Sequence, residues 1–394
     1  MRTNDLFLTA AAASMMMLAA CTHDDGTTSI SEPTPVGNEL IISTRHSEMG
    51  ITRAESNIQS SKFDLNAEID VFLKDASGVT DSTLYAPNPK LYKVIDTNGT
   101  IKTYSEGSIE NRLFWPKLIH ELYIFGVYPV GSVSWDNVVN KTNPTHAGYD
   151  PFSATQSYYF TVKEDQTSEA NYKASDLMTG LPSGYNVHAT SYTAPFKLTQ
   201  HENPGTVPLL FTHRLTKVVV NITKTTGTED TDIKIDDDII YTGESDTKYA
   251  RVTLMNTKRK TTFQVPSTNE LVDGVASNVG EVVVGRGSTT TTTTVGGYTA
   301  VTLSAIVPPQ DIAADTPFIK VDLIDETRTD LDASIAENRI TDTFYYLIPG
   351  GGLTLQASTV HTYNIRINKP HINVTTSITN WEDGGTINEI GTLQ

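Results

Sequence analysis

PLLFTHRLTKVVVNIT, residues 208–223, is the stretch of this sequence that decides the fold. Val, Ile, Thr and Phe dominate it, and these residue types favour the pleated surface of a β-strand. Its alternation predicts a strand rather than a helix. His213 lies inside this run, and a lone histidine in that setting fits a structural role better than metal binding.

Similar runs recur along the chain and predict an all-β protein built from β-sandwiches. They are IDVFL (69–73), HELYIFGVYPV (120–130), SYYFTV (157–162), YTAVTLSAIV (298–307), FIKVDLI (318–324), DTFYYLI (342–348) and TYNIRI (362–367). KLYKVIDTNGTIKTY reads as two strands around Asn98-Gly99, a pair that suits a tight hairpin turn. Long stretches with helical spacing and good caps are absent from the sequence.

The N-terminal segment resembles the export signal of a bacterial lipoprotein. The apolar run from Leu6 to Ala20 is shorter than the roughly 20 residues that a membrane-spanning helix needs. It ends in Leu-Ala-Ala-Cys, which resembles a lipobox, so residues 1–20 are interpreted as a signal peptide. Cys21, the only cysteine, is then the lipid attachment site, and two or more acyl chains there would make a stable anchor. An ordinary signal peptide or a core helix is the alternative.

Residues 21–53 are expected to form a tether and propeptide that includes a first strand. The part after Cys21 is polar, acidic and contains prolines, which favours a flexible linker. The formal net charge of the chain is −17, which argues against nucleic acid as a partner because phosphate binding requires clustered Lys and Arg. The charge suits a protein exposed to the medium.

The boundary between two domains is placed near QHENPGTVP, residues 200–208, a polar segment with two prolines. This gives an N-terminal domain over residues 54–203 and a C-terminal domain over residues 204–394. GRGSTTTTTTVGG, residues 285–297, is interpreted as a loop between strands, although its threonines would also allow it to extend a hairpin.

The sequence offers no catalytic constellation. GxxxxGK[ST], GxSxG, HExxH and paired CxxC patterns are absent, and the nine histidines lack metal-ligand spacing. We therefore expect no enzyme activity, no cofactor and no metal site. The acidic cluster from Asp230 to Asp238 carries oxygen ligands that suit calcium, but it does not match a twelve-residue calcium loop, and a solvated loop is the simpler interpretation.

Six segments in order resemble the fimbrillin family of Bacteroidales, the subunits of type V pili. The FxHxLxKV pattern within residues 208–223 is the most specific of them. The others are TRAES (52–56), FWPKLIHELYIFGVYPV (114–130), SDLMTG (175–180), IVPPQ (306–310) and HTYNIRINKPHINVTTSITNWEDGG (361–385). Together they cover most of the chain.

The resemblance implies two tandem transthyretin-like β-sandwich domains and a structural, adhesive subunit of a cell-surface pilus. Such a subunit reaches the outer membrane as a lipoprotein held through Cys21. An arginine-specific protease then removes the N-terminal segment with its first strand. Other pilus subunits are the implied partners, because each subunit donates a strand to the vacated groove of the next.

The resemblance leaves two arginines as cleavage candidates. NELIISTR, residues 38–45, reads as the short strand to be removed. Arg53 matches the TRA segment and is preferred, Arg45 is the alternative, and neither need be cut if the lipid anchor is retained.

The C-terminal strands are the donor candidates, within residues 362–378. Ile372, Val374, Thr376 and Ile378 fall on one face of a predicted strand. These strands would equally complete the C-terminal sandwich of their own subunit. A tip adhesin or a lipid-anchored, glycan-binding surface protein, using exposed aromatics to bind a host or bacterial surface ligand, therefore stays open as a second function.

Overall fold

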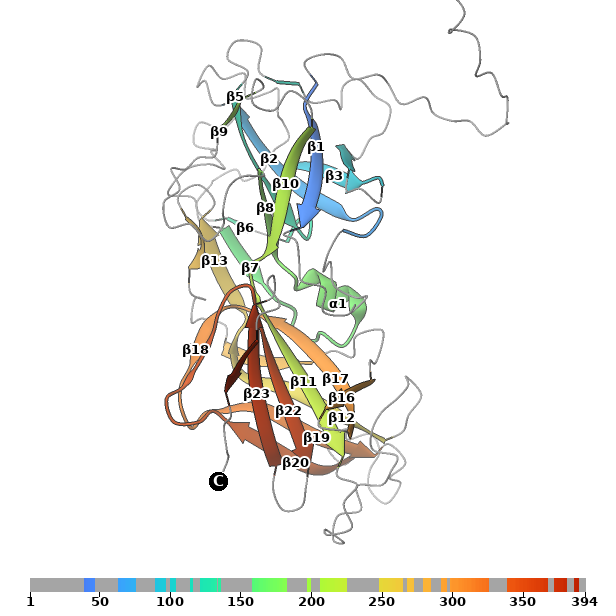
Figure 1. Cartoon of the computed structure of the whole chain (residues 1–394), viewed down its shortest axis with the longest axis vertical. Helices are drawn as coiled ribbons and strands as arrows, with labels where there is room; N and C mark the ends of the chain where they lie inside the picture. The colour runs from blue at the N-terminus through green and yellow to red at the C-terminus, as the bar shows by residue number, and fades with distance from the viewer. Residues whose placement is uncertain are drawn as a thin grey trace, which may run out of the picture. The chain divides into compact units, whose positions relative to one another are not determined.

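The part of the chain that the structure describes is built almost entirely from β-strands, which confirms the all-β prediction (Figure 1). The computed structural model describes residues 39–46, 63–75, 89–96, 100–103, 114–115, 121–132, 134–135, 158–182, 197–199, 206–224, 248–264, 268–272, 279–284, 292–295, 298–325, 339–367, 372–380 and 386–389. Within these ranges the one helix is α1 (Glu169–Ala174), and none is long and apolar enough to span a membrane.

The first sheet has eight strands and closes on itself. In spatial order its strands are β2 (Glu68–Asp75), β3 (Lys90–Val94), β4 (Thr100–Thr103), β1 (Ile41–His46), β10 (Thr206–His213), β8 (Met178–Pro182), β5 (Glu121–Tyr128) and β9 (Lys197–Thr199). Pairing of β2 with β5 closes seven of them into a ring, and β9 lies outside the ring on β5. The predicted hairpin around Asn98-Gly99 is confirmed in its two strands, β3 and β4.

Two further sheets form a sandwich from later parts of the chain. The six-stranded sheet contains, in order, β16 (Thr292–Val295), β17 (Tyr298–Val307), β11 (Thr216–Lys224), β22 (Thr359–Ile367), β23 (Ile372–Asn380) and β24 (Thr386–Glu389). The four-stranded sheet contains β15 (Val279–Val283), β12 (Lys248–Lys258), β19 (Pro317–Asp325) and β20 (Ile340–Leu347). Strand β16 takes up part of the threonine run, so that run extends a hairpin with β17.

Two small sheets complete the described strands. One contains β14 (Thr268–Val272), β13 (Lys260–Gln264), β7 (Tyr158–Thr161) and β6 (Ser134–Trp135), and the other contains β18 (Gln310–Ile312) and β21 (Leu353–Leu355). Strand β13 follows residue 204 and β7 precedes it, so this sheet joins the two halves of the chain.

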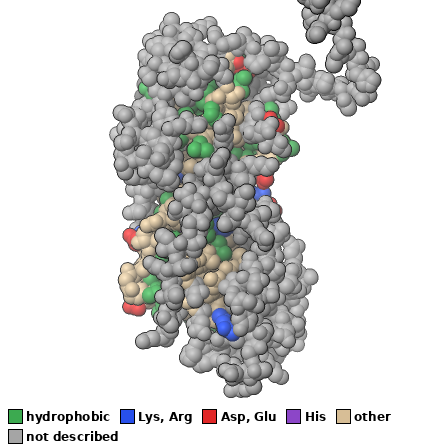
Figure 2. All heavy atoms as spheres, viewed as in Figure 1, with side chains coloured by type: hydrophobic (Ala, Val, Ile, Leu, Met, Phe, Trp, Pro, Cys, Tyr) green, Lys and Arg blue, Asp and Glu red, His purple; other side chains and the backbone are tan. Residues whose placement is uncertain are grey.

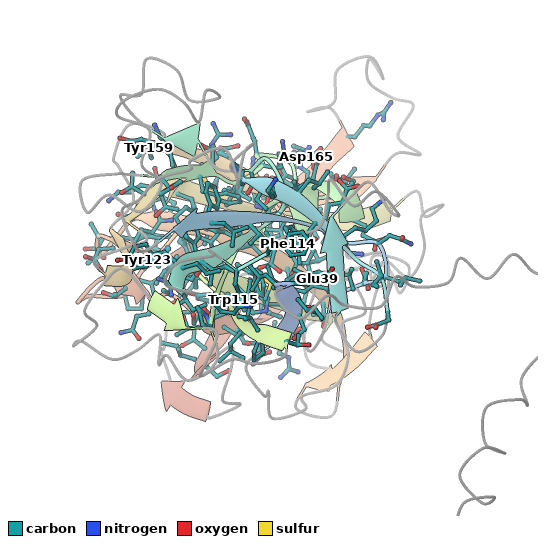
Figure 3. The ribbon with its side chains drawn as sticks, turned by 90° about the horizontal axis from the view of Figure 1, so that it is seen from above. Glu39, Phe114, Trp115, Tyr123, Tyr159 and Asp165 are labelled. Atoms are coloured by element: carbon teal, nitrogen blue, oxygen red, sulfur yellow. The ribbon has the colours of Figure 1, made fainter. Side chains whose placement is uncertain are left out.

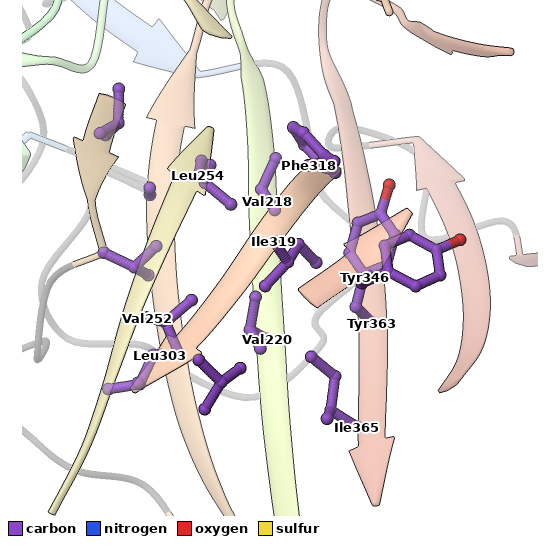
Figure 4. Packing of buried hydrophobic residues seen from close by; sticks show 14 of the residues in the cluster. Val218, Val220, Val252, Leu254, Leu303, Phe318, Ile319, Tyr346, Tyr363 and Ile365 are labelled. Carbon is purple, nitrogen blue, oxygen red and sulfur yellow. The ribbon is translucent and has the colours of Figure 1, made fainter. Parts of the chain in front are cut away.

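The buried side chains form three clusters. One fills the closed sheet and includes Ile42, Trp115 and Leu209. A second fills the sandwich, where alternate residues of β11 (Val218, Val220, Ile222) pack with inward-facing residues of β12 and β19 (Figure 4). This is the alternation that the VVVNIT segment predicts.

The third cluster lies between the closed sheet and the sandwich. It joins Phe72 and Phe125, stacked with ring centroids 4.4 Å apart, with Tyr158, Leu215 and Ile306. All the described residues belong to one compact unit, Gly37–Gln394. Strand β10 follows residue 203 yet pairs with β1 and β8 of the closed sheet. The division into domains at residues 203 and 204 stays a prediction.

On the face of the molecule shown in Figure 2, the described acidic and basic side chains are scattered and do not form one patch. Within the described ranges, no group of three or more His, Cys, Asp or Glu side chains is arranged to hold a metal ion.

Candidate functional site

Strand β1 occupies a central position in the closed sheet. It pairs in parallel with β10 over six residue pairs, from Ile41 opposite Thr206 to His46 opposite Phe211. On its other side it pairs antiparallel with β4, where Ile42 lies opposite Ile101. The first described strand of the chain thus bridges β4 and β10, and without it these two strands would have unpaired edges.

The side chains of β1 and of the residue before it alternate between core and periphery. Leu40, Ile42 and Thr44 are 5%, 1% and 4% exposed, whereas Ile41 and Ser43 are half-buried. Leu40 and Ile42 belong to the core cluster of the closed sheet, together with Trp115. Burying an aliphatic side chain of this size stabilises a fold by roughly 1.5–3 kcal/mol. Burial of Leu40 and Ile42 therefore stabilises the non-covalent packing of β1 in the closed sheet.

Phe114 and Trp115 lie near the start of this strand. Glu39 forms an isolated antiparallel bridge with Phe114, and Figure 3 shows Glu39, Phe114 and Trp115 in the same region of the molecule. Trp115 is 3% exposed, whereas Phe114 is 37% exposed. Trp115 is therefore buried in the same core cluster as Leu40 and Ile42.

Phe63 is the first described residue after β1, and its side chain is buried in the core. Its ring contacts the rings of Tyr128 and Phe211, with centroids 5.2 Å and 4.9 Å apart. The neighbouring Asp64 accepts a hydrogen bond of 3.0 Å from Lys173 of α1. The chain is thus anchored in the core ten residues beyond Arg53, through contacts with β5, β10 and α1.

Phe211 of β10 fills space that two glycines leave open. Gly126 of β5 and Gly180 of β8 are paired with each other, and Gly180 lies opposite Phe211. A Cβ atom at either glycine would lie within 2.5 Å of the Phe211 ring. The SDLMTG and FTHRL segments therefore meet across the β8–β10 ladder.

The same two segments meet again at a buried contact between two polar side chains. Nδ1 of His213 lies 2.7 Å from Oδ1 of Asp176, and both side chains are at most 3% exposed. The backbone N–H of Arg214 donates to the carbonyl of Leu177 at 2.9 Å. His213 thus has the structural role that the sequence indicates, but its partner was not predicted, because nothing in a single sequence joins positions 37 residues apart.

Two other buried titratable groups have shifted pKa values. Burial raises the pKa of Asp70 on β2 to about 6, although a 2.7 Å hydrogen bond from the Gly131 N–H partly opposes this rise. Burial lowers the pKa of His361 on β22 to about 4. Asp70 is 6% exposed and His361 is 2% exposed, so both shifts follow from loss of solvent around the charged form.

The donor candidates of the C-terminal strand lie in β23 of the sandwich. This strand pairs with β22 over nine residue pairs and with β24 on its other side. Val374 is 4% exposed and belongs to the sandwich core, whereas Thr376 and Ile378 are half-buried. Ile372 is the first residue of β23.

The other predicted site residues are only partly described. Arg45 lies inside β1, opposite Leu210 of β10. Cys21, Arg53 and the acidic cluster from Asp230 to Asp238 lie outside the described residues.

Comparison with known proteins identifies what this architecture resembles. A family model described as fimbrillin-like matches residues 52–381. A candidate cell adhesion protein from Bacteroides ovatus has a similar structure, with 16% sequence identity and a TM-score of 0.53 over 88% of this chain and 99% of that chain. Another from Bacteroides uniformis matches with 14% identity and a TM-score of 0.50 over 88% of this chain and 99% of that chain. A search of curated proteins finds no match.

Proposed function

The chain belongs to the fimbrillin-like family, and from that premise we propose that it is a structural subunit of a cell-surface type V pilus that serves adhesion. The observation that carries the proposal is the place of β1. A strand near the N-terminus closes the sheet between β4 and β10.

Removal of β1 would leave a groove with unpaired backbone edges and an exposed apolar floor. The edges of β4 and β10 would lose their backbone hydrogen bonds, and the sites of Leu40 and Ile42 would be open to water. A strand from another subunit would satisfy both, which is β-strand addition. One groove and one donor per subunit give a head-to-tail contact, and such contacts build a filament.

Cleavage after Arg53 fits this scheme better than cleavage after Arg45. Arg45 lies within the β1–β10 ladder, where its peptide bond is held in the closed sheet. Arg53 follows β1 and precedes Phe63, so a cut there would detach the whole strand and keep the Phe63 anchor. An arginine-specific protease would therefore release residues 21–53, including the lipid that we propose on Cys21 and its hold on the outer membrane.

The sequence of β23 supports it as the donor. Its face reads Ile372, Val374, Thr376 and Ile378, and the inward face of the β1 region reads Leu40, Ile42 and Thr44. Both carry two aliphatic residues followed by threonine at alternate positions. A donated β23 would thus present the side chains that the groove loses with β1.

Limited proteolysis tests this proposal. We expect an arginine-specific protease to give a new N-terminus at Ala54, followed by polymers. Arg53→Ala should stay uncut and monomeric, whereas the matched control Arg45→Ala should be cut and polymerise. A chain lacking residues 372–394, which keeps β22 in the sandwich, should be cut but remain monomeric. Cleaved full-length protein that stays monomeric at high concentration would contradict a stalk role.

One observation favours a second candidate, a tip adhesin or lipid-anchored glycan-binding protein. Strand β23 completes the sandwich of its own chain over nine residue pairs with β22. A subunit that keeps this strand would accept a donor without donating. Such a protein would bind a peptide of residues 372–380 after cleavage without forming polymers. Saturable glycan binding that is lost in Phe114→Ala or Tyr345→Ala would then identify the adhesive surface.

A further inference from the structure

Strands β10 and β11 form one nearly continuous extended segment through the molecule. Only Arg214 and Leu215 separate the end of β10 at His213 from the start of β11 at Thr216. Each strand carries a parallel partner, β1 beside β10 and β22 beside β11. In Figure 1, β10 lies in the closed sheet and β11 in the sandwich.

The crossing between the two strands is hydrogen-bonded at each step. The Arg214 N–H donates to Leu177 O at 2.9 Å, and the Ser358 N–H donates to Leu215 O at 2.9 Å. The Ser358 hydroxyl donates to the carbonyl of His213, and the Thr216 hydroxyl donates to Gln356 O at 2.6 Å. The backbone bends at Leu215, and it is hydrogen-bonded to neighbouring segments through Arg214 and Leu215 where it leaves one core for the other.

A brace lies beside this crossing. The Gln166 side chain donates to Ile306 O at 2.8 Å and accepts from Ile306 N at 2.8 Å. The Ser304 hydroxyl donates to the Tyr172 hydroxyl at 2.8 Å, and both side chains are buried. These contacts hold α1 and the preceding loop against β17, so the sandwich is oriented relative to the closed sheet by side chains outside the β10–β11 segment.

We propose that the segment formed by β10 and β11 carries tension from the β1 position to β22. A force applied along β1 loads its hydrogen bonds with β10 in shear, so all six residue pairs share it. The covalent backbone then carries the force across Arg214 and Leu215. The same shear geometry transfers it from β11 to β22 over nine pairs. The brace and the Asp176–His213 contact orient the two parts and bear little of the force.

This assignment rests on the proposed function only for its role in a pilus, where a donor strand in the place of β1 would transmit force to β10 in the same way. The physical claim concerns the unprocessed single chain and needs no partner. Failure to polymerise would therefore overturn the pilus proposal and leave the load path intact, and the reverse also holds.

Single-molecule pulling on the full chain tests the load path. Handles would be attached to Asn38→Cys and Asn368→Cys in a Cys21→Ser background, so that β1 and β22 are pulled in opposite directions. We expect the first event to be release of β1. It should lengthen the chain by at most about 90 Å, from roughly 25 residues up to Phe63 at about 3.6 Å each. An earlier event that separates the sandwich from the closed sheet would overturn the proposal.

Two variants separate the covalent path from the contacts around it. Asp176→Asn should leave the force of the first event unchanged, whereas Ile42→Ala should lower it. Insertion of Gly-Ser-Gly-Ser between Arg214 and Leu215 should add an earlier, low-force extension. The slack in the backbone would transfer the force to the contacts between the closed sheet and the sandwich, and these contacts would be pulled apart first. The same insertion between Gly350 and Gly351 is the matched control and should add none. Equal behaviour of the two insertions, or a loss of force in Asp176→Asn, would overturn the load path.

Discussion

Nδ1 of His213 on β10 lies 2.7 Å from Oδ1 of Asp176, which precedes the start of β8 at Met178 by two residues. Both side chains are buried beside the crossing from the closed sheet to the sandwich. The contact joins the SDLMTG segment to the FTHRLTKV segment, so two separate features of the sequence describe one structural joint. Along this part of the chain, Phe211 belongs to the core of the closed sheet, Leu215 to the cluster between the closed sheet and the sandwich, and Val218 to the sandwich core.

Asp176→Ala should destabilise the protein. His213 would remain buried without this hydrogen-bond partner, and leaving a buried polar group unpaired in this way costs about 1–3 kcal/mol. Asp176→Asn keeps an acceptor oxygen and should cost less. Urea unfolding of the three proteins measures the difference. Asp311→Ala, which removes an exposed contact with Thr354, is the control and should change stability by no more than about 0.5 kcal/mol. Equal losses in Asp176→Ala and Asp311→Ala would contradict the structural role of the joint.

The alternation of apolar residues made the strands predictable. VVVNIT, FIKVDLI and TYNIRI became β11, β19 and β22 because their alternate side chains fill one core. The parallel pairings β1–β10 and β11–β22 were beyond the sequence, because register between distant strands depends on the packing of the whole sheet.

The candidate site was predictable in its parts and not in its arrangement. NELIISTR could be read as a short strand, but its central position between β4 and β10 follows only from the closure of the sheet by β2 and β5. The same holds for Trp115 of the FWPKLIHELYIFGVYPV segment, because one sequence does not show what its ring packs against. The structure buries its side chain in the same core cluster as Leu40 and Ile42.

Ile42→Ala should affect the precursor and not the processed protein. In the precursor Ile42 is 1% exposed in the core, and its truncation should cost about 2–4 kcal/mol. After cleavage at Arg53 and loss of β1, the substitution is no longer part of the molecule. Thermal unfolding before and after proteolysis measures both states. Ile41→Ala, at a half-buried position on the same strand, is the control and should cost less. A stability difference that persists after β1 is removed would be inconsistent with its release.

Gly180→Ala should destabilise the closed sheet through a clash. The new Cβ would lie 2.4 Å from the Phe211 ring, and overpacking of this kind costs about 1–3 kcal/mol. Phe211→Leu in the same chain should recover part of that loss, because the smaller side chain leaves room. Gly350→Ala, which meets no atom within 4 Å, is the control. Denaturation midpoints of wild type, the two single variants, the double variant and the control provide the comparison, and additive losses in the double variant would argue against the clash.

Asp70 and His361 should give opposing dependences of stability on pH. The pKa of Asp70 is raised to about 6, so the stability it contributes is complete at low pH and is lost as pH rises through 6. The pKa of His361 is lowered to about 4, so its contribution is complete above 6.5 and is lost as pH falls through 4. Between these limits the two effects offset each other, and the contribution of the pair should change little.

Single variants should expose each contribution. Relative to wild type, acidification should destabilise Asp70→Asn by about 1.4 kcal/mol per pH unit and stabilise His361→Gln by a similar amount. Chemical denaturation between about pH 4 and pH 6.5 measures both slopes. Parallel pH profiles in wild type and the two variants would show that neither group titrates as its burial indicates.

Hydrogen exchange at β10 tests most directly whether β1 gives way to a strand from another subunit. The amides of residues 206–211 that bond to β1 should be protected in the precursor, exchange rapidly after cleavage at Arg53 and removal of residues 21–53, and regain protection in polymers. Residues 218–222 of β11, buried between β17 and β22, provide the internal control and should stay protected throughout. Protection of β10 that persists in cleaved monomers would contradict an open groove, and rapid exchange that persists in the polymers would contradict its occupation by a donor strand.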